Sequence, residues 1–107
     1  MTSNVQGLGP RDRPRERLRA LGPAALSSAE LLAIVLGTGV AARDVIGLAH
    51  ALLADAGGSL RHLAARPMAE WQRHEGLGPT KAVRLLAAFE LGLRAAQEER
   101  PARLRIR

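Results

Sequence analysis

Apolar residues recur with a helical period along most of the chain, and glycine or proline separates one periodic segment from the next. Between residues 44 and 53 they form one stripe, predicted to be buried, at Val45, Ile46, Leu48, Ala49, Leu52 and Leu53. After residue 79 the spacing i, i+3, i+4, i+7 returns at Ala82, Leu85, Leu86, Phe89 and Leu93. Stripes of this kind predict amphipathic helices that pack around a common core.

Capping signals predict where the helices begin and end. Ser27 and Glu30 have the spacing of a capping box, ahead of an apolar helix that is expected to end at Gly37. Prolines suited to a first helical turn and glycines suited to a helix end mark other boundaries, at Pro14, Gly22, Gly57, Gly58, Pro67 and Pro79. The predicted fold class is therefore all-α, with five or six short helices.

Both ends of the chain are predicted to lie outside this helical domain, which we place at residues 14–100. Residues 1–13 carry glycine, proline and charges without an apolar period, as expected of a flexible basic leader. Pro101 is expected to stop the last helix. The following residues alternate apolar side chains with arginines, which is the period of a strand. Residues 101–107 are therefore predicted to be a linker or the first β-strand of a missing C-terminal domain.

Composition and charge narrow the classes of function. The 107 residues include no cysteine, which excludes disulfides and thiolate metal sites and makes the cytoplasm the expected location. No apolar run approaches the ~20 residues of a membrane span, so no membrane partner is expected. The net charge is +6, and the basic excess lies in residues 1–19 and 94–107. Such ends are either arms that attract a polyanion or tails that keep the chain soluble.

The stretch HEGLGPTKA, residues 74–82, has the composition of a turn that suits phosphate. Its two glycines let an anion approach the backbone, and the amides that begin the next helix lack intrahelical partners. Thr80 and Lys81 add a hydroxyl and an ammonium group, Leu77 is predicted to point inward as an anchor, and Gly78 is expected to need a positive φ. The alternative is a purely structural turn in which the glycines only cap helices.

This stretch resembles the helix-hairpin-helix motif of DNA-binding proteins. The resemblance implies sequence-independent contact with the DNA backbone. It assigns the phosphate-binding positions to Gly76, Gly78, Thr80 and Lys81.

An earlier segment, AELLAIVLGTG, weakly repeats AEWQRHEGLG, and an apolar helix follows each of them. The repeat indicates two helical hairpins packed as pseudo-duplicates. The first hairpin has one residue more before its helix and no lysine, so its predicted phosphate role is weaker. Its candidate residues are Gly37, Thr38, Gly39 and Arg43.

The wider sequence resembles the bacterial RadC-like proteins, which are commonly labelled DNA repair proteins. The likeness covers residues 10–95 and includes RPRERLRALGPAALSSAELLAIVLGTGV, GGSLRHL and EGLGPTKA. It implies that full-length members carry a second domain similar to JAB/MPN metallopeptidases, which binds zinc through an H-x-H motif and an aspartate. This chain has no H-x-H motif. We therefore expect neither enzymatic activity nor a cofactor in this segment.

Other candidate sites are less specific. His50, His62 and His74 fall on different predicted helices, so they are expected to be ordinary surface histidines rather than metal ligands. No Ser/His/Asp arrangement or pair of carboxylates stands out as a catalytic site. Trp71 and Phe89 lie on apolar helix faces and are predicted to pack in the core rather than stack on bases.

These patterns together predict a sequence-independent DNA-backbone binding module of a RadC-like protein, with the hairpin amides and Lys81 contacting phosphate. The alternative is a protein-interaction or structural domain that positions a metallopeptidase-like domain absent from this chain. Salt separates the two hypotheses, because phosphate contacts release counterions and apolar docking does not.

Overall fold

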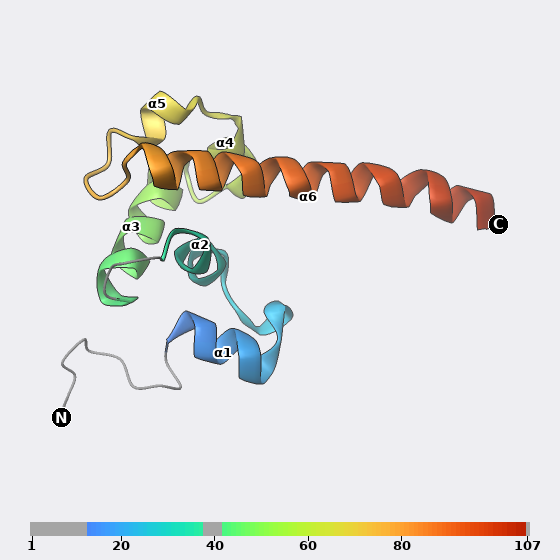
Figure 1. Cartoon of the computed structure of the whole chain (residues 1–107), viewed down its shortest axis with the longest axis horizontal. Coiled ribbons are helices and arrows are strands. Elements are labelled where there is room, and N and C mark those ends of the chain that lie inside the picture. Colours follow the sequence, from blue (N-terminus) through green and yellow to red (C-terminus); the bar gives the residue numbers. More distant parts are fainter. Residues whose placement is uncertain (1–12, 38–41, 107) are drawn as a thin grey trace.

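The computed structural model describes residues 13–37 and 42–106, and within these residues the fold is all-α and contains no strand (Figure 1). The six α-helices of this part agree with the predicted five or six. The elements are α1 (Pro14–Leu21), the 3₁₀ turn η2 (Pro23–Ala25), α2 (Ser28–Leu36), α3 (Ala42–Asp55), α4 (Leu60–Ala65), α5 (Met68–Trp71) and α6 (Pro79–Ile106).

The capping box at the start of α2 forms as the sequence predicts. Ser27 Oγ accepts a hydrogen bond from the Glu30 amide at 3.1 Å, and the Glu30 carboxylate accepts one from the Ser27 amide at 2.8 Å. Arg17 Nε on α1 lies 2.7 Å from the same carboxylate and ties α1 to this helix end. The hydrogen bond from the Ser27 amide and the charge of Arg17 hold the pKa of Glu30 below its ordinary value, against the opposing effect of burial.

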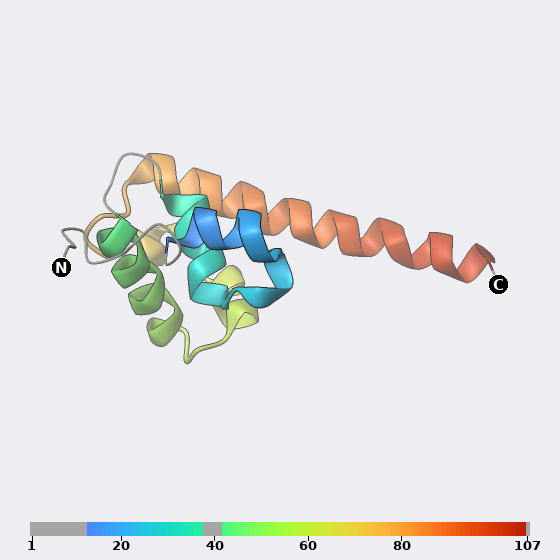
Figure 2. The ribbon, with the colours of Figure 1, turned by 90° about the horizontal axis from the view of Figure 1, so that it is seen from below.

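The hydrophobic core surrounds α2, which packs against α1, α3 and α6 (Figures 1 and 2). α3 contributes a stripe of buried residues and α6 contributes Ala82 and Leu85, with Phe89 packed against the core. α4 and α5 close the side of the core away from α1. The largest fully buried side chains are Trp71, Leu36, Leu52, Leu63 and Leu85. The stripe predicted on α3 is confirmed, with Val45, Ala49 and Leu52 buried and its other members partly buried against them.

Trp71 holds the short helix α5 in the core. Its indole Nε1 donates a buried hydrogen bond to the Leu63 carbonyl at 3.0 Å, and its ring centroid lies 5.8 Å from that of Phe89 on α6. A helix of one turn is not stable alone, so α5 depends on these tertiary contacts. The prediction that both aromatic residues serve the core is confirmed.

Helix α6 continues past its predicted end at Pro101 and extends well beyond the globular part of the molecule (Figure 1). The expectations that Pro101 stops this helix and that a β-strand follows are both wrong, because residues 101–106 are helical. Proline removes one intrahelical hydrogen bond, but no described strand is present for residues 101–106 to pair with. A strand without a partner leaves its backbone groups unpaired, so the helix is the better alternative.

The apolar spacing of α6 continues past the point where the core ends. Leu85 is buried, whereas Leu86 and Leu93 are 45% and 53% exposed. The spacing therefore predicted the helix correctly, but only its first turns lie against the other helices. No described helix is both long and apolar enough to cross a membrane.

Candidate nucleic-acid interface

The candidate hairpin is the turn that joins α5 to α6. The His74 amide donates to the Trp71 carbonyl at 3.1 Å, and the Leu77 amide donates to the His74 carbonyl at 3.1 Å. The Ala82 amide then donates to the Gly78 carbonyl at 3.0 Å, which makes Gly78 the residue that caps the start of α6. Two successive turns of backbone thus reverse the chain within a few residues.

Leu77 anchors this turn in the core, as predicted. It is only 2% exposed, although the residues on both sides of it are exposed. Ala82, one turn into α6, is fully buried, and its small side chain allows close packing at this point. The turn also lies close to α3, because a Cβ on Gly76 would lie 3.8 Å from Leu48 Cδ2.

The two glycines of the hairpin have different roles. Gly76 adopts φ +96°, a conformation that favours glycine. Gly78 does not have a positive φ, so the expectation that it needs one is wrong. A Cβ built on Gly78 meets no atom within 4 Å, so the space beside this residue is open. Gly76 is therefore required by the backbone, whereas Gly78 leaves the amides accessible.

The four predicted phosphate-binding residues lie together on this turn. Gly76, Gly78 and Thr80 are exposed, and Lys81 is half-buried. Pro79 has no N–H, so the amides near the start of α6 that lack an intrahelical acceptor are those of Thr80 and Lys81. These amides lie at the positive end of the helix dipole, next to the open space at Gly78.

The first hairpin is only partly described. Gly37 follows α2, and a Cβ there would lie 2.7 Å from the Ala33 carbonyl oxygen, so this glycine is required by close backbone packing. Thr38 and Gly39 lie outside the described residues, and so does the side chain of Arg43. The predicted weaker phosphate role of this hairpin stays a prediction.

Arg84 connects α6 to the end of α2. Its guanidinium donates to the Val35 carbonyl at 3.4 Å, close to the C-terminus of α2 and one turn of α6 beyond Lys81. A cation is favourable at a helix C-terminus, where the carbonyl groups lack intrahelical partners. The sequence analysis missed this residue, since the contact joins positions far apart in the chain.

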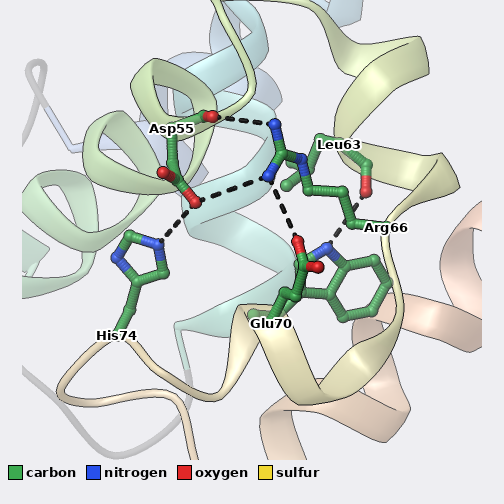
Figure 3. A network of polar contacts seen from close by, with 6 residues as sticks. Asp55, Leu63, Arg66, Glu70 and His74 are labelled. Carbon is green, nitrogen blue, oxygen red and sulfur yellow. Dashed lines mark hydrogen bonds and ion pairs between the residues drawn. The ribbon is translucent and has the colours of Figure 1, made fainter.

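A network of polar contacts lies beside α5, the helix that precedes the hairpin (Figure 3). Arg66 Nη2 donates to the Asp55 carbonyl at 2.9 Å, and Arg66 Nη1 lies 3.2 Å from Glu70 Oε1. The Asp55 carboxylate is 3.9 Å from Arg66 Nη1 and 3.5 Å from His74 Nε2. The network links the end of α3 with the α4–α5 segment and the hairpin. His50 and His62, in contrast, are exposed on α3 and α4.

Comparison with known proteins identifies the family. The UPF0758 N-terminal family model matches residues 5–83. The chain belongs to the UPF0758 family. This is the RadC-like family, so the predicted family membership is confirmed.

The chain spans less than half the length of the UPF0758 relatives described below. One from Burkholderia mallei (strain SAVP1) is 50% identical over 94 residues, which are 85% of this chain and 34% of the relative. One from Symbiobacterium thermophilum is 48% identical over 102 residues, 90% of this chain and 44% of the relative. One from Stenotrophomonas maltophilia (strain K279a) is 52% identical over 83 residues, 78% of this chain and 35% of the relative. No solved structure matches the chain.

Proposed function

We propose that this UPF0758 chain is a sequence-independent DNA-backbone binding module of the helix-hairpin-helix type. Phosphate is held by the first amides of α6, with Gly78 leaving the approach open and Lys81 adding a charge. The observation that carries the proposal is the combination of a buried Leu77 with an exposed, unobstructed Gly78 at the start of a long helix.

Physical chemistry supports phosphate as the ligand of this turn. Amide groups at a helix start favour an anion, and a flexible surface loop would have to be ordered before it could offer them in a fixed arrangement. Here Leu77 and Ala82 already fix the turn against the core. Backbone amides cannot distinguish one base from another, so the proposed binding is independent of sequence.

A salt titration tests the proposal. Binding of a fluorescein-labelled DNA duplex of random sequence is measured by anisotropy at several salt concentrations, together with single-stranded and branched DNA. The affinity of the parent should fall steeply as salt rises. Lys81→Ala should weaken binding similarly for all DNA sequences and lower the slope of log affinity against log salt by roughly one unit.

A matched variant separates a local contact from net charge. Arg73→Ala likewise removes one positive charge, but from an exposed residue that follows α5 at the other end of the turn in sequence. It should change the salt slope less than Lys81→Ala does. Equal slopes for both variants and the parent would mean that the hairpin does not contact DNA.

A second candidate function is protein docking, which the exposed apolar residues of α6 favour. Leu91 and Leu93 are 67% and 53% exposed on the part of α6 beyond the core. In the longer family members this helix would then position a further, metallopeptidase-like domain. Docking buries apolar area, so its affinity should respond little to salt. Both roles are compatible with a cytoplasmic location. The DNA repair label of the family agrees with the first role, DNA binding.

A further inference from the structure

We infer that Arg66 is a positioning residue that sets the orientation of the DNA-binding hairpin, although it does not touch DNA itself. The DNA-binding measurements that test this inference rest on the proposed function. The inference goes beyond that function because it assigns a role to a basic side chain outside the hairpin and excludes that side chain from phosphate contact.

Arg66 contacts several other groups of the protein. One guanidinium nitrogen, Nη2, donates to the Asp55 carbonyl at the end of α3, at 2.9 Å. The other, Nη1, lies 3.2 Å from the Glu70 carboxylate and 3.9 Å from that of Asp55. The Arg66 amide also donates to the Leu63 carbonyl at 3.1 Å. Side chain and backbone of this residue therefore join three elements, α3, α4 and α5.

The charge balance around Arg66 disfavours a nucleic-acid contact. Two carboxylates, those of Asp55 and Glu70, face one guanidinium, and its own side chain is only 34% exposed. A phosphate at this place would meet two negative charges at short range. Lys81 differs, because no ion pair of its ammonium group occurs among the described residues.

The network reaches the hairpin in two ways. His74 Nε2 lies 3.5 Å from the Asp55 carboxylate, and the His74 carbonyl accepts the hydrogen bond from the Leu77 amide. The Leu63 carbonyl, bonded to the Arg66 amide, also accepts the indole N–H of Trp71, the last residue of α5. Helix α5 has a single turn, so these contacts, together with Trp71 burial, determine where the hairpin begins (Figure 3).

The decisive experiment compares Arg66→Lys with Lys81→Ala in the duplex titration. Arg66→Lys keeps the charge but loses the planar fork that holds two partners at once. We expect Arg66→Lys to bind DNA about three- to fivefold more weakly than the parent, because the loss of a partly exposed ion pair has an effect of about this size. Its salt slope should equal that of the parent. Lys81→Ala should lower that slope by roughly one unit. Arg61→Lys, at an exposed position on α4, is the matched control and should bind as the parent does.

Variants of His74 test the same connection without changing Arg66. His74→Ala removes the imidazole that lies 3.5 Å from the Asp55 carboxylate and should also weaken binding at an unchanged salt slope. His74→Gln keeps an N–H donor at similar reach and should restore most of the affinity. Parental binding by Arg66→Lys, or a salt slope lowered by Arg66→Ala, would overturn the inference, since either result makes Arg66 a charge rather than a positioning residue.

Amide exchange of the free protein separates this inference from the proposed function. In Arg66→Lys, the Leu77 amide should exchange faster than in the parent, while the amide of Leu52 in the core should exchange at the parental rate. If the parent binds no DNA but this difference is found, the proposed function fails and the positioning role stands. If Leu77 exchanges at the parental rate, the positioning role is overturned whatever the DNA result.

Discussion

Leu77 is the single residue on which the geometry of the hairpin most depends. We expect Leu77→Asp to lower the free energy of unfolding by about 3 kcal/mol or more, because an unpaired carboxylate would be buried between the hairpin and the core. Chemical denaturation measures the loss. The control is Leu93→Asp, at a half-exposed position of α6, which should change stability by about 0.5 kcal/mol at most. Coinciding curves for Leu77→Asp and the parent would show that the turn is not anchored.

Gly78 offers a test that separates folding from binding. Aspartate is a favourable N-cap residue, so Gly78→Asp should leave the melting temperature unchanged or slightly higher. Its carboxylate would occupy the Thr80 and Lys81 amides and repel phosphate, so DNA binding should be lost even at low salt. Gly78→Asn, which caps without a charge, should bind with intermediate affinity. Parental DNA binding by Gly78→Asp would place the contact elsewhere.

For individual residues, the sequence predicted side-chain burial better than it predicted backbone angles. Burial of Leu77 follows from a lone apolar residue between glycines, which a turn can direct inward. The positive φ lies at Gly76 rather than Gly78 because the reversal is completed one residue before the helix cap. The i, i+4 spacing of Arg66 and Glu70 is a local signal for their ion pair, but nothing local predicts that Arg66 and His74 both meet Asp55, which happens only once α3, α4 and α5 have packed.

Among the elements, α2 has the best-defined start, and its capping box makes a pH-dependent contribution to stability. Because the folded pKa of Glu30 is lowered, its carboxylate stabilises the fold above the ordinary pKa of glutamate, and this contribution is lost as the pH falls through the folded pKa. Glu30→Gln should therefore cost about 1 kcal/mol at neutral pH and progressively less in acid. Denaturation at neutral and acidic pH measures the difference, and Glu16→Gln, on the exposed side of α1, is the control.

Helix starts were predictable from the sequence because caps are local, whereas the end of α6 was not. Ser27 with Glu30, and the prolines at positions 14 and 79, act within one turn of the helix that they begin. Whether residues 101–106 form a strand depends on a neighbouring strand, which no local pattern can supply. The prediction of a strand there assumed such a partner.

For the whole molecule, the basic charge and the core occupy different regions. The globular part presents its hairpin amides at one end of α6, while the other end of this helix extends away from the core (Figures 1 and 2). Residues 99–107 contain four arginines and one glutamate, half of the net charge of +6. Under the proposed function, we expect the hairpin to supply the geometry of the DNA contact and the basic ends to supply much of the long-range attraction.

Truncation after Glu98 tests this expectation. Since the removed residues continue a helix that has already left the core, the melting temperature should stay at the parental value. DNA affinity at low salt should fall and the salt slope should decrease, because up to three net positive charges are lost. Replacing Arg100, Arg103, Arg105 and Arg107 by glutamine in the full chain keeps the length and should reproduce the loss. If the truncated chain binds DNA with parental affinity and slope, the hairpin alone holds the DNA and the basic end of α6 is only a solubilising tail.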